Sequence, residues 1–218
     1  MPEPSAFAPQ KSLDRRGALF GAAGLLTLAA ARPPPVVTLL GDSITAGYGL
    51  SAQAALPAQL QIALAGLGVV ARVRAAGVSG DTTAGGLARL DFSVQPDTRL
   101  CLVALGGNDL LQGVDPAQSR GNLNRIVARL KARRIGVLLC GLHAPPVIGK
   151  AYARDFDAVF PAVARGQGVR LYPDLLAGVS GHRSLVQADG LHPNAAGAAL
   201  IAQRLAPVVK AVVSNSVT

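Results

Sequence analysis

The sequence predicts an α/β protein, a three-layer α/β/α sandwich built around a five-stranded parallel sheet. Short aliphatic runs alternate with longer stretches in which apolar residues recur at helical spacing, the pattern of consecutive βαβ units. Glycine-containing turns follow four of the aliphatic runs. The 218 residues, 50% hydrophobic and 15% charged, are enough for one buried core. We therefore expect a single compact domain after an N-terminal segment.

Five aliphatic runs rich in Val, Leu and Ile are the expected strands. They cover residues 36–40, 69–75, 100–105, 135–140 and 169–172. Each is short enough for a strand and is bounded by glycine, proline or polar residues. Because helical stretches separate the runs, the strands are expected to be parallel.

Four helices are expected between and after these strands. The first covers 57–67 and stops at Gly68, and the second covers 116–134 because Asp115 is a cap followed by proline. Residues 151–167 form a third, which Pro161 should bend or divide. The last follows the cap Asn194, and Pro207 is expected to kink it.

Residues 1–31 have the pattern of a secretory signal peptide. Arg15 and Arg16 precede an apolar run over 17–31, which ends in three alanines. Adjacent arginines favour the twin-arginine export route. A helix kept as an uncleaved membrane anchor is the alternative, although three prolines follow at 33–35. We therefore expect a periplasmic or secreted protein whose domain covers 32–218.

The charge balance is strongly basic. Lysine and arginine number 21 against 12 acidic residues, a formal net charge of +9. Seven of the arginines illustrate how these cations scatter along the sequence: Arg72, Arg89, Arg129, Arg133, Arg165, Arg183 and Arg204. With five Phe, three Tyr and no Trp, few side chains could stack on bases. The pattern indicates a solvated basic surface, with no nucleic-acid partner; contact with anionic lipid stays open.

The two cysteines, Cys101 and Cys140, are expected to be buried free thiols. Cys101 opens one aliphatic run and Cys140 closes another. In neighbouring parallel strands such positions would be about 13 Å apart, since a strand rises about 3.3 Å per residue. A disulfide needs Cα atoms within about 7 Å.

Polar residues follow the expected strands at the edge of the sheet where their carboxyl ends meet. Ligands bind at this edge in open α/β sheets. Ser43 comes two residues after Gly41, where the first strand must turn into a helix, so its hydroxyl could be presented there. Taken alone, such a serine is more typical of a turn or a helix cap.

Asp189 and His192 lie three residues apart, directly before the last expected helix. A serine hydroxyl becomes a good nucleophile when an imidazole removes its proton, and a carboxylate on the other ring nitrogen orients that imidazole. Spacing of three residues allows this pairing within one turn. The alternative is a surface histidine beside a helix cap. His143 and His182 have no carboxylate nearby in the sequence and are interpreted as structural.

Attack on an ester carbonyl also needs donors for the developing negative charge. Gly80 allows close approach of a backbone N–H, and the Asn108 side chain can donate without carrying charge. Each alone is a typical loop residue. Their order on successive strand ends, together with Ser43 and the Asp189–His192 pair, indicates an active site.

Four segments together resemble the conserved blocks of the SGNH (GDSL) hydrolases. They are Gly-Asp-Ser-Ile at 41–44, Gly-Val-Ser-Gly-Asp-Thr-Thr at 77–83, Gly-Gly-Asn-Asp at 106–109 and Asp-Gly-Leu-His-Pro-Asn at 189–194. The resemblance is to the bacterial periplasmic thioesterase I, lysophospholipase and arylesterase branch, and it spans about 36–209. It implies a flavodoxin-like sheet.

The resemblance also implies roles for individual residues. Ser43 would be the nucleophile, His192 the base and Asp189 its orienting carboxylate. The backbone N–H groups of Ser43 and Gly80, with the Asn108 side chain, would form the oxyanion hole. A substrate-lining loop would contain Ala144, Pro145, Pro146 and Val147.

Two departures from the family pattern bear on these expectations. Ala75 stands where relatives often carry asparagine, so a hydrogen bond supporting the second block is expected to be missing. Val147 and Ile148 are more apolar than the family pattern, which leaves the acyl-chain preference open.

The function that follows is hydrolysis of carboxylic esters or thioesters, including aryl, alkyl and lysophospholipid esters, through an acyl-Ser43 intermediate. No metal and no organic cofactor is expected, and the partner is a small-molecule ester. A carbohydrate O-acetyl esterase is the alternative within enzymes, because the same residues would serve it. A non-catalytic lipid- or glycan-binding relative is the alternative from another class. The sequence leaves the physiological substrate and the oligomeric state open.

Overall fold

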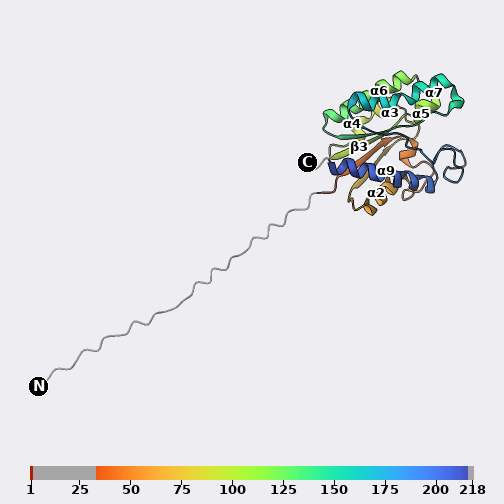
Figure 1. Cartoon of the computed structure of the whole chain (residues 1–218). Helices are drawn as coiled ribbons and strands as arrows, with labels where there is room; N and C mark the ends of the chain where they lie inside the picture. Colours follow the sequence, from red (N-terminus) through yellow and green to blue (C-terminus); the bar gives the residue numbers. More distant parts are fainter. Residues whose placement is uncertain (2–32, 216–218) are drawn as a thin grey trace. The chain divides into compact units, whose positions relative to one another are not determined.

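The computed structural model describes residue 1 and residues 33–215 (Figure 1). The chain divides into two units, Met1–Arg32 and Pro33–Thr218, and the second contains all the elements described below. The expected signal peptide, 1–31, lies outside the described residues apart from Met1.

A five-stranded parallel sheet forms the centre of the domain. Its strands are β1 (Val36–Gly41), β2 (Arg72–Gly77), β3 (Thr98–Ala104), β4 (Gly136–Cys140) and β5 (Arg170–Tyr172). They lie in the order β2-β1-β3-β4-β5, and every pair is parallel. The predicted sheet is confirmed. The order reverses beside β1, so the carboxyl ends of β1 and β3 flank the position where a ligand is expected.

Helices cover both faces of the sheet, which gives the predicted three layers (Figure 1). One layer holds α2 (Leu56–Gly66) and α9 (Ala195–Asn215), which contact each other. The other holds α3 (Thr83–Ala88), α6 (Pro116–Ala132) and α8 (Val159–Gln167). The central strands β1, β3 and β4 are buried almost completely, because helices pack on both of their faces.

The second strand begins three residues later than the sequence predicts. The Val69 N–H donates to the Leu64 carbonyl, which closes the end of α2, and Val70 is exposed. These two valines therefore belong to the helix end and its turn. The aliphatic character of the run could not separate a helix end from a strand start.

The helix expected over 151–167 is divided into α7 (Lys150–Asp157) and α8, with the break at Ala158. Pro161 is the third residue of α8. The first N–H groups of a helix have no intrahelical acceptor, so proline costs no hydrogen bond there. The predicted division is correct, but the break comes before the proline.

The last helix, α9, is a core element that passes through Pro207 without ending. Its length and apolar composition alone would suit a membrane span, and it is the one such helix found among the described residues. One stripe of α9 is buried in the domain, and its members are Ala198, Ile201, Ala202, Leu205, Ala206, Val209 and Val213. This burial is that of a core helix.

Short helices that the sequence analysis did not predict follow several strands. They are α1 (Ser43–Ala46), α3 (Thr83–Ala88), α4 (Leu90–Ser93), α5 (Gly107–Gln112) and the 3₁₀ turn η1 (Pro146–Ile148). Each is too short to give a periodic signal.

Both cysteines are buried and free, as predicted. Cys101 is aligned with Val137 of β4, so Cys140 lies three residues further along that strand. Burial raises the pKa of both thiols to about 12, so they stay protonated at neutral pH.

Candidate active site

The Ser43 hydroxyl is placed by a tight turn at the carboxyl end of β1. Ser43 is the first residue of α1, and the Asp42 carboxylate caps that helix by accepting from the Ile44 N–H at 3.0 Å. A Cβ on Gly41 would lie 2.5 Å from the Ala104 carbonyl oxygen, so only glycine fits before this turn. The close packing of β1 on β3 therefore fixes where Ser43 begins the helix.

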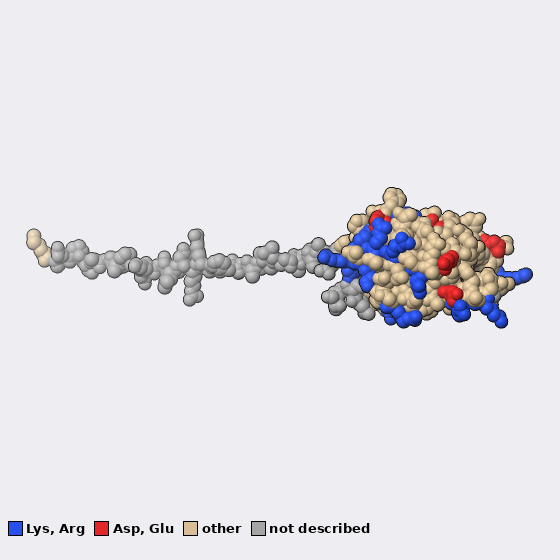
Figure 2. All heavy atoms as spheres, turned by 90° about the horizontal axis from the view of Figure 1, so that it is seen from above, with Lys and Arg blue, Asp and Glu red and all other residues tan. Residues whose placement is uncertain are grey.

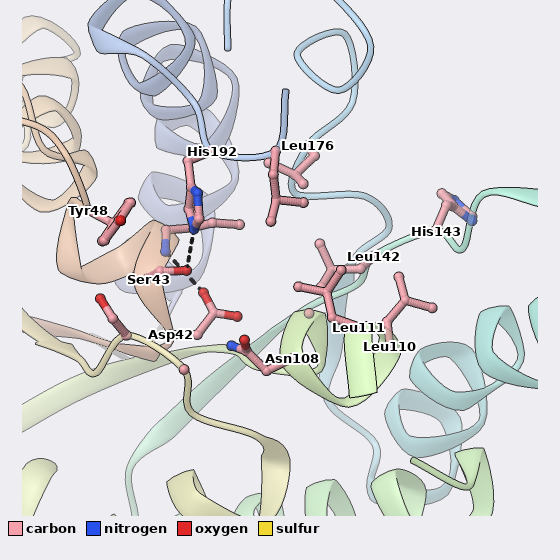
Figure 3. A pocket seen from close by; sticks show the side chains of 15 residues that line it. Asp42, Ser43, Tyr48, Asn108, Leu110, Leu111, Leu142, His143, Leu176 and His192 are labelled. Carbon is pink, nitrogen blue, oxygen red and sulfur yellow. Dashed lines mark hydrogen bonds between the residues drawn. The ribbon is translucent and has the colours of Figure 1, made fainter. Parts of the chain in front are cut away.

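Ser43, His192 and Asp189 form a continuous hydrogen-bonded chain. The Ser43 Oγ lies 2.9 Å from His192 Nε2 (Figure 3), and His192 Nδ1 lies 2.7 Å from Asp189 Oδ2. The two segments are 149 residues apart in the sequence. The sequence predicted the Asp189–His192 pairing, and the structure brings both residues to Ser43.

The Asp189 carboxylate is held in its charged form. Its Oδ1 accepts from the backbone N–H groups of Leu191 and His192, at 2.9 and 3.0 Å. The hydrogen bond to the His192 ring, reinforced by these two, lowers the pKa of Asp189 to about 2. A carboxylate that is charged throughout the neutral range can orient the imidazole and stabilise an imidazolium.

Gly80 and Asn108 line the same pocket as Ser43. Gly80 has φ +86°, and its N–H donates to no protein group within residues 33–215. The Asn108 Nδ2 donates to the Asp81 carbonyl at 2.9 Å, and the side chain lies below Ser43 in Figure 3. Since an amide nitrogen has two hydrogens, one N–H of Asn108 remains for a ligand.

A buried network holds the segment that carries Asn108. The Asp109 carboxylate is fully buried and accepts from the Thr83 N–H at 2.7 Å and the Thr83 hydroxyl at 2.5 Å. Ser119 donates a further hydrogen bond to it, at 2.8 Å. The network ties α3, α5 and α6 together directly behind the Gly80 turn.

The pocket beside Ser43 has a volume of about 240 Å³ and a largely apolar wall. Five leucines line it, namely Leu110, Leu111, Leu142, Leu176 and Leu191. Asp42 also lines the pocket, and its burial raises the pKa of that carboxyl to about 6. Among the described residues, no group of three or more His, Cys, Asp or Glu side chains is arranged to hold a metal ion. The polar groups thus meet at one end of an apolar cavity.

The chain matches the model of the GDSL-like lipase/acylhydrolase family over residues 39–200. It belongs to this family. Among the similar proteins is esterase TesA of Pseudomonas aeruginosa, 38% identical over 88% of this chain and 96% of the relative. Thioesterase 1/protease 1/lysophospholipase L1 of Escherichia coli K12 is 36% identical over 88% of this chain and 90% of the relative.

Solved structures of esterases share the fold. The crystal structure of TesA superposes with a TM-score of 0.77 at 38% identity, over 81% of this chain and 99% of that one. The SGNH-hydrolase esterase AlinE4 has a TM-score of 0.70 at 42% identity, over 82% and 96%. Esterase EstA from Pseudoalteromonas, solved with monoethylphosphonate as inhibitor, has a TM-score of 0.77 at 28% identity, over 83% and 99%. This GDSL hydrolase is a serine esterase, as the sequence predicted.

Two residues beside His192 were not identified from the sequence. The Tyr48 ring lies 4.6 Å from the His192 ring, inclined at 39°. The Gln187 side chain donates to the Tyr48 carbonyl at 2.7 Å and to the Pro193 carbonyl at 3.0 Å. Gln187 therefore connects the loop after Ser43 to the loop that carries His192. Its partner Tyr48 is 139 residues away, a distance at which no local pattern gives a signal.

Arg89 has a different role from the one that the sequence analysis gave it. It was grouped with the scattered surface cations, but its side chain is mostly buried and makes an ion pair with Asp81 at 2.5 Å. The same guanidinium donates to the carbonyls of Gly41 and Ala76, each at 2.8 Å. Arg89 thus joins the ends of β1 and β2 to the residue that follows Gly80.

The loop after β4 reaches the pocket through Leu142 and His143. Of the four predicted lining residues, Ala144, Pro145 and Val147 are not among the residues that line it, and the Pro146 side chain lies outside what the structure describes. The Ala144 N–H donates to Asp157 at 2.8 Å, which turns the chain toward α7, and Val147 is 89% exposed. His143, interpreted as structural, lies at the pocket with Asp157 3.4 Å from its Nδ1.

Proposed function

We propose that Ser43 is the nucleophile that attacks the carbonyl carbon of a carboxylic ester or thioester. The hydrogen-bonded chain from Ser43 through His192 to Asp189 is the observation that carries this proposal. His192 Nε2 takes the Ser43 proton as the new C–O bond forms, and Asp189 stabilises the resulting imidazolium. The imidazolium then protonates the departing alcohol or thiol.

The acyl-Ser43 intermediate is hydrolysed by the same groups. His192 removes a proton from a water molecule, whose oxygen attacks the acyl carbon, and then returns the proton to Ser43 as the acid leaves. In both halves the negative charge forms on the carbonyl oxygen. The N–H groups of Ser43 and Gly80 and the free N–H of Asn108 are proposed to bind it. This assignment is supported by the position of all three residues around the pocket.

The leucine-lined wall favours an ester whose acyl or aryl part is apolar. Burying one methylene group contributes about 0.8 kcal/mol, so each added carbon should improve binding until the pocket is filled. Thioesters and lysophospholipids carry such acyl groups. An acetylated carbohydrate would place little apolar surface against the five leucines, and this makes the O-acetyl esterase the weaker proposal.

A p-nitrophenyl alkylphosphonate tests the nucleophile, because an activated serine oxygen displaces p-nitrophenolate from phosphorus and keeps one phosphonyl group. Mass spectrometry of the digested protein should find one adduct on Ser43 with complete loss of activity, and none in Ser43→Ala. His192→Ala should label far more slowly, because the hydroxyl keeps its proton. An active protein with no adduct on Ser43 would exclude the mechanism.

A series of p-nitrophenyl esters tests the substrate class. The value of kcat/KM is expected to rise from acetate to the medium-chain esters and then to level off. Leu176→Asn, which changes the pocket wall, should reduce this rise, whereas Leu67→Asn on the surface should not. Failure on all aryl esters with turnover of acetylated sugars would favour the O-acetyl esterase.

Export is proposed from the sequence of residues 1–31, with removal of the segment to leave a domain of 32–218. Fractionation of a bacterial host should find the activity in the periplasm or medium. Replacing Arg15 and Arg16 by lysine should retain the protein inside the cell if the twin-arginine route is used. Unchanged export of that variant would exclude this route.

A further inference from the structure

The fold gathers at one edge of the sheet cations that are scattered along the sequence. Three begin strands or stand next to their starts, namely Arg72 of β2, Arg99 of β3 and Arg170 of β5. Arg133 and Arg134 are separated from the start of β4 only by Ile135, and α6 returns to the same edge with its last turn. We call this surface the basic edge and define it as Arg72, Arg74, Arg99, Arg129, Lys131, Arg133, Arg134 and Arg170. It lies opposite the pocket, which is at the carboxyl ends of the strands.

Figure 2 shows Lys and Arg side chains gathered at the end of the domain where its described chain begins. Two carboxylates neutralise part of this charge: Asp97 pairs with Arg72 and Arg74, and Asp91 pairs with Arg129 and Arg133. Within residues 33–215, no carboxylate lies within 4.0 Å of Arg99, Arg134 or Arg170. The basic edge therefore has eight cations against two carboxylates.

Acidic side chains are concentrated at the other end of the domain. The remaining carboxylates of residues 33–215 follow the carboxyl ends of strands or stand in the segments beyond them: Asp42, Asp81, Asp109, Asp115, Asp155, Asp157, Asp174 and Asp189. The basic edge thus has a net charge of +6, whereas the other nine Lys and Arg side chains of residues 33–215 are nearly balanced by these eight carboxylates, so the excess positive charge is concentrated at one end of the strands. Such a separation orients a protein on an anionic surface with its positive end inward.

Arg134 has a backbone conformation that usually requires glycine. It follows the C-cap Arg133 of α6 and has φ +59°, the one non-glycine residue with positive φ within the described part of the chain. The Arg134 N–H donates to Lys131 and the Ile135 N–H to Leu130, at 2.8 and 3.0 Å, which is a Schellman motif. Glycine is the usual residue at this position because it avoids the strain. A cation is present here despite a local preference for glycine.

The start of the described chain also lies at this edge. The Arg72 N–H donates to the Pro35 carbonyl at 3.0 Å, immediately before β1. The described part of the proposed mature domain, which starts at Pro33, therefore begins beside the basic edge.

We propose that the basic edge docks on the anionic phospholipid headgroups of a bilayer. The pocket then faces away from that bilayer and takes its substrate from the aqueous side. This orientation goes beyond the proposed esterase activity and does not depend on it. Several cations acting together on one surface give useful affinity, since each contributes about fivefold near an anionic leaflet.

Vesicle flotation of the full chain tests the proposal. Wild type should bind vesicles of phosphatidylcholine with about 30 mol% phosphatidylglycerol more tightly than pure phosphatidylcholine, and raising the salt about tenfold should weaken this binding. The test variant combines Arg72→Gln, Arg99→Gln and Arg134→Gly. Its partition coefficient should fall by about 100-fold, the product of three such contributions.

A matched control variant also loses three positive charges, but from outside the basic edge. It combines Arg120→Gln, Arg154→Gln and Arg183→Gln, three exposed cations that belong to α6, α7 and the segment before α9 on the pocket side of the domain. Its partition should change less than about threefold, less than one cation at the bilayer would contribute. Both variants retain the same N-terminal segment, so insertion of that segment affects them equally.

Arg134→Gly alone separates binding from folding. The substitution removes a cation, so vesicle binding should fall about fivefold. It also places glycine at a positive φ, where glycine avoids the backbone strain of other residues, so the midpoint of thermal unfolding should stay the same or rise. Esterase activity on a soluble ester should be unchanged in all three variants. Equal losses in the two triple variants, binding insensitive to salt, or no preference for the anionic vesicles would overturn the proposal. Tighter binding to a DNA duplex than to the vesicles would overturn it in favour of a nucleic acid.

Discussion

The Asn108 side chain donates one N–H to the Asp81 carbonyl at 2.9 Å, which ties α5 to the turn containing Gly80. The hydrogen bond therefore holds together the segments that carry two of the three proposed oxyanion donors, Gly80 and Asn108, and it leaves the second N–H of Asn108 free. Structural support and oxyanion binding are compatible in one amide, because its two hydrogens point in different directions.

Asn108→Ala is expected to lower kcat by about 10²- to 10³-fold with little change in KM, since the hydrogen bond strengthens only as the carbonyl becomes tetrahedral. Loss of the bond to Asp81 should also lower stability by about 1 kcal/mol. Steady-state kinetics and thermal unfolding measure the two effects separately. Asn108→Asp should be at least as damaging, because a carboxylate repels the oxyanion. Near-normal kcat in the Asp variant would exclude the oxyanion role.

Arg89 is expected to act as a positioning residue through Asp81 and the Gly41 carbonyl. Arg89→Met keeps much of the side-chain volume but removes all the donors, so we expect kcat to fall about tenfold at a temperature where the variant is folded. A double-mutant cycle with Asn108→Ala gives the decisive readout. If Arg89 acts by holding the oxyanion turn, the double variant should lose less than the product of the single effects. Fully multiplicative effects would show that Arg89 only supports the fold.

The site residues that the sequence did predict are those whose partners are local or whose strands end together. Asp189 and His192 pair within one turn, and Gly80 and Asn108 follow strands whose carboxyl ends share an edge. Arg89 could not be found in this way, because its backbone acceptors lie 13 and 48 residues away on two different strands. The basic edge could not be predicted for the same reason: its residues are far apart in the sequence, and only the order of the strands in the sheet shows that they share an edge.

Gln187 is expected to set the distance between Ser43 and His192. Gln187→Met has a similar shape but cannot donate to the Tyr48 and Pro193 carbonyls, so the two loops should separate slightly. We expect kcat to fall about tenfold while KM changes little, because the ester pocket itself is untouched. Gln167→Met is the control, since Gln167 donates to Asn124 far from Ser43. An equal loss of kcat in both variants would contradict the assignment.

Asp189 is expected to stay ionised over the whole working range of the enzyme. Its folded-state pKa is lowered to about 2, so it contributes stability above its unfolded value near 4 and loses that contribution as the pH falls toward 2. Protonation of Asp189 should therefore make no contribution to the pH dependence of kcat/KM above about pH 4. Asp189→Asn should lower kcat by about 10²- to 10⁴-fold, less than His192→Ala, because an amide can hold the ring without stabilising its charge. Full activity in the Asn variant would contradict the role.

The ionised Asp42 carboxylate is expected to destabilise the folded protein at neutral pH, whereas the ionised Asp189 carboxylate stabilises it. Its carboxyl is 3% exposed and its folded-state pKa is raised to about 6 by burial. A group whose pKa is raised in the folded state binds its proton more tightly there, so its contribution to stability is present below about pH 4 and is lost as the pH rises through 6. A shift of this size corresponds to a loss of about 2 to 3 kcal/mol at neutral pH.

Asp42→Asn should therefore stabilise the protein at about pH 7.5 by about 2 kcal/mol. The amide oxygen can still accept from the Ile44 N–H, so the cap of α1 is kept. At about pH 4 the wild-type carboxyl is itself protonated, and the two proteins should unfold at the same temperature. Asp115→Asn is the matched control, because Asp115 caps α6 in the same way from an exposed position and should give no such gain. Thermal unfolding across this pH range measures the difference. A gain in Asp42→Asn that is equal at both pH values would mean that the buried charge is not its cause.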